Sequence, residues 1–377
     1  MTRRPFVSII GPFYNEEDYI RDTLSSLAAQ VDHSGNLFDR ESFEIILVDN
    51  RSTDGTLEVI KTFSAENPGL KFKVLKEMEK GHIHARISGM RFAIHHQNGP
   101  HVLVGIDTDT LFPKRWLQSL LDCLEQEDAS ACGSPGYFTG EMWLTARRLS
   151  ERYLREVGTL FFDPETVEKL GAKGKRYLFT QEVFKDFERP FSDCGFAIKK
   201  EAYLRAGGYR IEHQKANPSQ ELLAEGWRLK FQLDHLGEKV SYTDKTFFTT
   251  SPRRFLQDSV GMFDGTTYDT MADYRSRVRQ SDFMKLDSIA GRLNFRHLQA
   301  YVVRNYMLLP CLTKAPLLQK NRRYFAGFYD ELEADLKRLR DSLDWKDSNS
   351  IFETGYTVTE KYFDKVLNVV SQLEFRA

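Results

Sequence analysis

His101-Val-Leu-Val-Gly-Ile106 is an uninterrupted apolar run, and the chain continues from it as Asp107-Thr108-Asp109-Thr110. A short apolar run followed by turn-forming polar residues is typical of a buried strand that ends at the surface. In an extended chain residues i and i+2 point to the same side, so Asp107 and Asp109 are expected to face one ligand. Two carboxylates this close repel each other unless a cation lies beside them. We therefore expect Mn²⁺ or Mg²⁺ here, because both ions favour oxygen ligands.

The chain before this segment alternates between strand and helix signals. Runs rich in Val, Ile, Leu and Phe predict three further strands, at residues 6–10, 43–48 and 72–75. Segments with apolar residues three or four positions apart predict helices between these strands, at residues 16–30, 56–63 and 85–96. Such alternation indicates βαβ units and a mainly parallel sheet. In sheets of this kind ligands bind at the carboxyl ends of the strands.

The alternation fades in the middle of the chain. Residues 137–190 are expected to be helical or loop material inserted over the sheet, and strand and helix signals resume at 191–209 and 240–242. Beyond residue 251 the pattern becomes helical. We therefore expect an α/β fold with a mainly parallel sheet in residues 1–250 and a mostly helical C-terminal region in residues 251–377.

Composition narrows the class of protein. The 53 Lys and Arg residues and 54 Asp and Glu residues give a formal net charge of −1, which argues against nucleic acid as a partner. No apolar run approaches the roughly 18 residues of a spanning helix, and the N-terminus lacks the pattern of a signal peptide. The expected location is cytoplasmic, with peripheral contact at the inner face of the membrane left open.

The four cysteines give a separate expectation. Cys123, Cys132, Cys194 and Cys311 include no C-x-x-C pair, so no zinc ribbon or thioredoxin motif is present. We interpret them as free, mostly buried thiols in a reducing compartment.

Several polar blocks follow the predicted strands in a characteristic order. Pro12-Phe-Tyr14-Asn-Glu16-Glu17 follows the first strand and Asp49-Asn50-Arg-Ser-Thr-Asp-Gly-Thr56 follows the second. Gly81-His-Ile-His-Ala-Arg86-Ile-Ser-Gly89 comes before the Asp107 segment, and Ala197-Ile-Lys-Lys-Glu-Ala-Tyr-Leu-Arg-Ala-Gly-Gly-Tyr209 comes after it. In this order the blocks resemble those of the family 2 glycosyltransferases, which have the GT-A fold. The resemblance extends over residues 6–242.

This resemblance implies an inverting transfer of a sugar from a nucleotide sugar, first of all a UDP-sugar, to an acceptor hydroxyl. Asp109 and Asp107 correspond to the metal-binding carboxylates. The resemblance and the position of two arginines after the last strand assign ten residues to the nucleotide sugar: Pro12, Tyr14, Glu16, Asp49, Asn50, Arg86, Asp107, Thr108, Arg253 and Arg254. For Arg86 the alternative is a surface ion pair, and for Arg253 and Arg254 it is a solvated turn.

Asn50 departs from the family pattern, which has aspartate there. An amide donates and accepts hydrogen bonds, whereas a carboxylate only accepts, so the choice of nucleotide base stays open.

Inversion also requires a general base that removes the acceptor proton. The family places a Glu-Asp pair after the Gly-Gly block, and this chain has Glu225-Gly226 there. Glu225 is the first candidate. Glu221 is the second, because it would share a helical face with Glu225 at i, i+4, and Asp193 is the third. The alternative for Glu225 is a helix-capping carboxylate. His82, His84 and His213 are possible extra metal ligands, but we interpret them as ordinary polar loop residues.

Other classes fit less well. The first strand is not followed by G-x-G-x-x-G, and the chain has no P-loop motif. A catalytically silent relative that binds a nucleotide sugar or a partner protein remains the alternative, because of Asn50 and Gly226. The C-terminal region could form an acceptor platform, a lid, an oligomer interface or a membrane-surface contact. The acceptor, whether glycan, lipid-linked or protein, is left open.

Overall fold

The computed structural model describes residues 6–96, 101–172, 174–188, 192–219, 221–222, 224–257 and 280–373, apart from the side chains of Arg254 and Phe255. These residues form two compact units. The described part of unit 1 falls within Met1–Gly136 and Pro190–Ser251. That of unit 2 falls within Tyr137–Arg189, Pro252–Tyr274 and Val278–Ala377.

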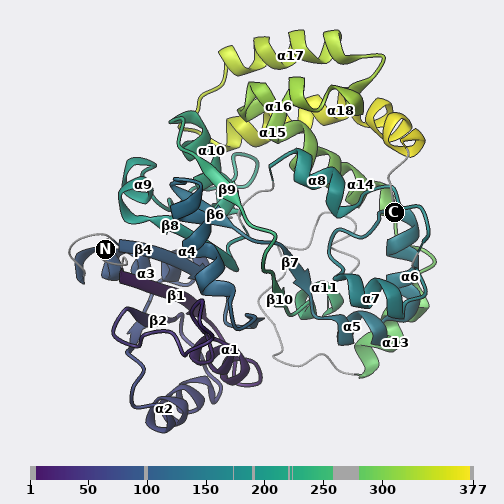
Figure 1. Cartoon of the computed structure of the whole chain (residues 1–377). Helices are drawn as coiled ribbons and strands as arrows, with labels where there is room; N and C mark the ends of the chain where they lie inside the picture. Colours follow the sequence, from purple (N-terminus) through teal and green to yellow (C-terminus); the bar gives the residue numbers. More distant parts are fainter. Residues whose placement is uncertain are drawn as a thin grey trace. The chain divides into compact units, whose positions relative to one another are not determined.

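Unit 1 is built on a seven-stranded sheet with the order β3-β2-β1-β4-β8-β6-β9 (Figure 1). Its strands are β1 (Phe6–Phe13), β2 (Phe43–Asp49), β3 (Phe72–Lys76), β4 (His101–Ile106), β6 (Ala131–Gly133), β8 (Gly195–Lys199) and β9 (Val240–Tyr242). The strands β3, β2, β1 and β4 are parallel, and β8 runs antiparallel to both of its neighbours. The predicted α/β fold with a mainly parallel sheet is confirmed.

Three short strands lie outside this sheet. In unit 1, β5 (Thr110–Leu111) and β10 (Phe248–Thr250) pair antiparallel. β7 (Gly136–Phe138) begins at the last residue of the first segment of unit 1. The pairing of β5 with β10 brings the residues after β4 next to the end of unit 1.

Helices cover both faces of the sheet. Helices α1 (Ile20–Ala28), α2 (Thr56–Glu66) and α4 (Trp116–Gln126) contribute to one apolar core. Helices α3 (His82–His96), α9 (Lys200–Arg205) and α10 (Glu225–His235) contribute to the other. The strand residues alternate between the two cores, as the period of an extended chain requires.

Strand β2 illustrates the alternation. Ile45 and Leu47 enter the core with α1 and α2, whereas Ile46 and Val48 enter the core with α3. Helix α3 lies so close to the sheet that a Cβ atom on Gly89 would be 2.5 Å from Ile10 Cγ2. The second glycine of the Gly81–Gly89 block is therefore required by packing.

The carboxyl ends of the central strands meet at one edge of the sheet. Phe13 at the end of β1 lies opposite Asp49 at the end of β2. Beyond β4, the Thr108 hydroxyl donates a hydrogen bond of 3.0 Å to the carbonyl of Pro12 in β1. The three polar segments after β1, β2 and β4 are thus brought together, as the parallel sheet predicts.

Unit 2 is helical. Its helices are α5 (Gly140–Thr145), α6 (Arg147–Glu156), α7 (Pro164–Lys169), α8 (Gln181–Asp186), α11 (Arg253–Gln257), α13 (Gln280–Ile289), α14 (Phe295–Val303), α15 (Leu309–Thr313), α16 (Ala315–Lys320), α17 (Tyr329–Asp341) and α18 (Ser348–Gln372), with the π-helix η3 (Arg304–Leu308) and the 3₁₀-helix η4 (Arg322–Phe325). The predicted helical C-terminal region is confirmed. Residues 137–189 group with this unit, whereas the sequence analysis assigned them to the first domain.

Aromatic packing explains why residues 137–189 group with unit 2. Trp143 stacks on Phe162 with ring centroids 4.7 Å apart, and Tyr153 packs edge-on against Phe295 of α14. The aromatic side chains of this segment therefore share a core with the C-terminal helices.

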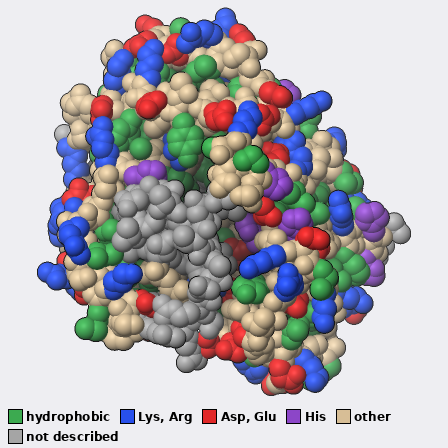
Figure 2. Space-filling model, turned by 180° about the vertical axis from the view of Figure 1, so that it is seen from behind, with side chains coloured by type: hydrophobic (Ala, Val, Ile, Leu, Met, Phe, Trp, Pro, Cys, Tyr) green, Lys and Arg blue, Asp and Glu red, His purple; other side chains and the backbone are tan. Residues whose placement is uncertain are grey.

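Two surface properties were expected from composition. In the part of the chain that the structure describes, no helix combines the length and apolarity needed to cross a membrane. On the face of the molecule drawn in Figure 2, acidic and basic side chains are interspersed over the described surface. This agrees with the net charge of −1.

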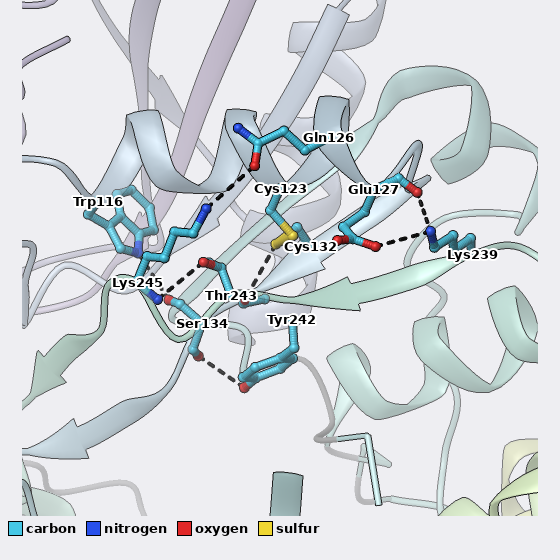
Figure 3. The surroundings of a disulfide bond; sticks show 11 residues. Trp116, Cys123, Gln126, Glu127, Cys132, Ser134, Lys239, Tyr242, Thr243 and Lys245 are labelled. Atoms are coloured by element: carbon cyan, nitrogen blue, oxygen red, sulfur yellow. Dashed lines mark hydrogen bonds and ion pairs between the residues drawn. A yellow bond between two sulfur atoms is a disulfide. The ribbon is translucent and has the colours of Figure 1, made fainter. Parts of the chain in front are cut away.

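The cysteines differ from expectation. Cys123 of α4 and Cys132 of β6 form a disulfide bond with their Cα atoms 6.3 Å apart (Figure 3). Cys194 and Cys311 are free. The prediction of free thiols is therefore wrong for Cys123 and Cys132. That prediction rested on the absence of C-x-x-C pairs. It failed because the turn between α4 and β6 brings these two cysteines together.

We predict that removing this disulfide lowers thermal stability. A bond that closes a loop of about ten residues contributes about 2–3 kcal/mol by restricting the unfolded chain. The double variant Cys123→Ser/Cys132→Ser should melt several degrees below the wild type, and its melting should not respond to reductant. Titration of the denatured, unreduced wild type should find two thiols; finding four would contradict the pairing.

Candidate active site

Reciprocal hydrogen bonds join the segments that follow β1 and β2. Asn15 adopts a left-handed backbone conformation with φ of 56°, and its amide oxygen accepts from the Thr53 backbone N–H at 2.8 Å. The backbone N–H of Asn15 donates to Ser52 Oγ at 3.1 Å, and that of Glu16 donates to Thr56 Oγ1 at 2.8 Å. The polar blocks that follow β1 and β2 are therefore fastened together at this edge of the sheet, where Tyr14 is half-buried.

Asn50 uses both functions of its amide. Its nitrogen donates to the Glu79 carbonyl at 2.6 Å, and its oxygen accepts from the Gly81 backbone N–H at 2.9 Å. An aspartate could not donate to the carbonyl. The amide at this position therefore fastens residues 79–81, just before α3, to the end of β2. Asp49 beside it accepts from the Ser52 backbone N–H at 2.8 Å.

The carboxylates after β4 have the orientation that the i, i+2 spacing predicts. Asp107 and Asp109 are half-buried, whereas Thr108 and Thr110 are buried. Asp109 accepts a hydrogen bond of 3.2 Å from Thr250 Oγ1 in β10. The Thr108 side chain contacts the Pro12 carbonyl, so it holds this turn in place.

Arg86 of α3 links three segments of the site. Its guanidinium forms an ion pair with Asp107 through Nη2 and lies 3.0 Å from Glu225 Oε1 through Nε. Nη1 donates to the backbone carbonyl of Asp193 at 3.2 Å. Burial alone would lower the pKa of Arg86, but the carboxylates of Asp107, Asp193 and Glu225 raise it well above its usual value. Only 3% of Arg86 is exposed, so the alternative of a surface ion pair is wrong.

Glu225 is held between Arg86 and His82. Besides Arg86, His82 Nε2 lies 2.9 Å from Glu225 Oε1. Burial would raise the pKa of this carboxyl, but His82 and Arg86 outweigh burial and hold the pKa well below its usual range. Glu225 is therefore a stable anion and a weak proton acceptor.

Glu221 does not share a helix with Glu225. Helix α10 begins at Glu225, and Ala224 before it has a left-handed backbone with φ of 62°. Glu221 instead pairs with His84, with Nε2 and Oε1 3.2 Å apart. The expected i, i+4 relation is therefore wrong. The interpretation of His82 and His84 as loop residues is also wrong, since α3 begins at His82.

Asp193 lies just before β8, against the start of α10. Its Oδ1 accepts from the Tyr209 hydroxyl at 2.9 Å, and its Oδ2 accepts from the Gly226 backbone N–H at 2.9 Å. Burial and the negative charge of Glu225 raise the pKa of Asp193 to about 7, against the opposing effect of Arg86. Its neighbour Cys194 donates to Asp107 Oδ2 at 2.9 Å.

The two arginines after the last strand belong to α11, in unit 2. Arg253 is buried. The Arg254 side chain lies outside the described residues. Their contact with a diphosphate stays a prediction.

The sequence analysis missed two residues of the cluster. Tyr209 holds Asp193, and Cys194 holds Asp107. The available signal was position, because Tyr209 ends the Gly-Gly block and Cys194 follows a candidate base. Both types of side chain are common in cores, so this signal was weak.

We predict that Asn50→Asp loosens the segment before α3. The new carboxylate cannot donate to the Glu79 carbonyl, and an unsatisfied buried group costs about 1–3 kcal/mol. The variant should unfold at lower urea concentration, with faster amide hydrogen exchange at residues 79–81. Asn36→Asp, at an exposed position, is the control. Unchanged exchange in Asn50→Asp would show that the amide does not hold this segment.

Comparisons with known proteins show which family and which relatives the chain is similar to. The family described as glycosyl transferase family 2 matches residues 8–203. Glycosyltransferase AglE of Haloferax volcanii is 26% identical over 207 residues, which are 52% of this chain and 64% of that protein. The minor teichoic acid biosynthesis protein GgaA of Bacillus subtilis is 29% identical over 136 residues, which are 36% of this chain and 28% of that protein.

Among solved structures, the mannosyltransferase PcManGT from Pyrobaculum calidifontis in complex with GDP-Man and Mn²⁺ is 17% identical, with a TM-score of 0.45. That comparison covers 96% of this chain and 87% of the other. The chain spans less than two thirds of the length of the two curated relatives named above, 64% and 28%. The family match covers more than half of the chain, from β1 into α9. The chain belongs to glycosyl transferase family 2.

Proposed function

We propose that the chain is an inverting glycosyltransferase that moves a sugar from a nucleoside diphosphate sugar, first of all a UDP-sugar, to an acceptor hydroxyl. The observation that carries the proposal is the shared edge formed by the segments after β1, β2 and β4. At this edge the half-buried carboxylates of Asp107 and Asp109 lie near a polar rim. The rim is formed by residues 14–16 after β1 and residues 49–56 after β2, which hydrogen bonds hold together. Relatives named as glycosyltransferases support the reaction class.

The rim of the site suits a nucleoside. Asp49 accepts one backbone hydrogen bond from Ser52, and a carboxylate has capacity for further donors. Uracil carries such a donor at its N3–H, which supports a UDP-sugar as the donor to test first. Tyr14 and Glu16 would contact the nucleoside from the β1 side. Asn50 would act by holding the rim and not by contacting the base.

The carboxylates after β4 fit a divalent cation. Asp109 and Asp107 supply hard oxygen ligands of the kind that Mn²⁺ and Mg²⁺ favour. Within the described ranges, no group of three or more His, Cys, Asp and Glu side chains is placed to hold a metal, so diphosphate oxygens would complete the coordination. When bound, the cation would stabilise charge on the departing diphosphate. Asp107 is also bound to Arg86 and Cys194, which makes Asp109 the main ligand.

Arg86 would act through Asp107. Its guanidinium is buried between carboxylates, so it would orient Asp107 toward the sugar side of the donor. The acceptor is expected to be a glycan, lipid-linked or other hydroxyl. The proton of that hydroxyl must be removed by Glu225, Glu221 or Asp193.

The first experiment measures donor turnover. The wild-type chain is incubated with UDP-, GDP- and dTDP-sugars, each with and without Mn²⁺, and release of the nucleoside diphosphate is followed. We expect release from one nucleotide class only, stimulated by Mn²⁺. Asp109→Asn should reduce this rate by about 100-fold or more, because loss of several kcal/mol of charge stabilisation corresponds to such a factor.

The control is Asp22→Asn, an exposed carboxylate on α1, which should keep the wild-type rate. Thermal melting with each nucleotide accompanies the assay, because a ligand at about 100 times its Kd adds roughly 2.7 kcal/mol of stability. A nucleotide-dependent shift with no turnover of any donor would favour the catalytically silent alternative. Turnover that ignores Mn²⁺ would remove the metal from the proposal.

A further inference from the structure

The Asp193 carboxylate lies where a side chain on residue 226 would begin. A Cβ atom built on Gly226 would lie 2.6 Å from Asp193 Oδ1 and 2.8 Å from its Cγ. Real Cβ atoms do not approach other atoms this closely, so a side chain at 226 would require the Asp193 carboxylate to move from its present position. Gly226 stands where the family pattern has the aspartate of its Glu-Asp pair. A carboxylate from a different segment fills the space beside it.

The Asp193 carboxylate is also oriented. Tyr209 donates to one oxygen and the Gly226 backbone N–H donates to the other, each at 2.9 Å. Each carboxylate oxygen has two lone-pair directions, so each keeps one for a further donor. The residue is half-buried. Through Cys194, the same turn contacts Asp107 at the carboxyl end of the sheet.

We propose that Asp193 is the general base of this chain and supplies, from the turn before β8, the carboxylate that position 226 lacks. This proposal rests on the function proposed above. In the step, the acceptor O–H proton passes to a carboxylate oxygen of Asp193. The acceptor oxygen forms a bond to the anomeric carbon of the sugar. The bond from that carbon to the diphosphate oxygen breaks, and its electron pair leaves with the nucleoside diphosphate.

The charged groups around the three candidates favour Asp193. Glu225 is paired with His82 and Arg86, which keep its pKa low. Glu221 is paired with His84. The Glu225 carboxylate, whose pKa is held low, is therefore a poor proton acceptor at neutral pH.

Around Asp193 the balance differs. Glu225 of α10 raises its pKa together with burial, and Arg86 of α3, Tyr209 and the Gly226 N–H lower it, with a net value of about 7. Arg228 of α10 also interacts electrostatically with Asp193, and the neighbouring Cys194 is hydrogen-bonded to Asp107. A base of this strength is matched to catalysis near neutral pH.

A purely structural role makes different predictions. Asp193 accepts from the second residue of α10, so it also caps that helix and complements its dipole. If capping were its only role, substitution would lower the melting temperature and leave the pH dependence of turnover unchanged. Catalysis and capping can therefore be separated by measuring both.

The test is a carboxylate exchange between the two positions. Wild type, Asp193→Asn, Asp193→Ala, Gly226→Asp and Asp193→Ala/Gly226→Asp are compared by release of nucleoside diphosphate from the donor identified above, with Asp22→Asn as control. We expect Asp193→Asn and Asp193→Ala to lose about 100-fold or more in kcat, the usual contribution of a general base. Gly226→Asp alone should also lose activity, because the new side chain collides with Asp193.

The double variant should regain at least about ten-fold over Asp193→Ala, because it restores a carboxylate next to the position that Asp193 leaves empty. Position 226 has no left-handed backbone, so aspartate fits there without strain. In wild type, kcat should fall as pH decreases below about 7, since the protonated carboxyl cannot accept a proton. The Asp193→Asn variant should lack this acidic limb while its melting shift with the nucleotide stays as in wild type.

The outcomes separate the two proposals. No turnover by the wild type with any donor would overturn the proposed function. An active wild type whose Asp193→Asn variant keeps its kcat and its acidic limb would overturn the assignment of Asp193 and leave the function standing. Loss of activity in Glu225→Gln combined with an active Asp193→Asn would assign the proton transfer to Glu225 instead.

Discussion

The buried guanidinium of Arg86 is the constraint on which the site depends. It holds the start of α3 against Asp107 after β4 and against Glu225 at the start of α10. A buried charge of this kind is tolerated only when it is paired, and removal of one partner typically costs about 3–5 kcal/mol. The ion pairs of Arg86 with Asp107 and Glu225 therefore fix the relative positions of three segments that are far apart in sequence. Arg86 also sets the electrostatics, because Glu225 stays ionised beside it while Asp193 nearby does not ionise readily.

The sheet and the position of the site could be predicted because both depend on local patterns. Continuous apolar runs predict buried strands such as β2, and polar residues at their carboxyl ends predict where a ligand binds. Asp107 and Asp109 were predicted to face one way for the same reason. These inferences need only neighbouring residues, and the structure places the strands within a few residues of the predicted bounds.

The interactions between distant segments could not be predicted in this way. Glu221 lies beside His84 and not on a helix with Glu225, because α10 begins only after Ala224, which has a left-handed backbone conformation. The disulfide between Cys123 and Cys132 depends on a turn between a helix and a strand. The grouping of residues 137–189 with unit 2 depends on aromatic packing against helices that come more than a hundred residues later. Local periodicity contains no information on such contacts.

The two departures from the family pattern, Asn50 and Gly226, were the argument for a catalytically silent relative. In the structure each departure is matched by a neighbour. The Asn50 amide meets a carbonyl and an N–H of residues 79–81, which aspartate could not satisfy together. Gly226 leaves the space that the Asp193 carboxylate fills. A site that was losing its function would be expected to lose side chains without replacement. The contacts at these two positions instead support the proposal that other residues of this chain supply the polar chemistry at the carboxyl end of the sheet.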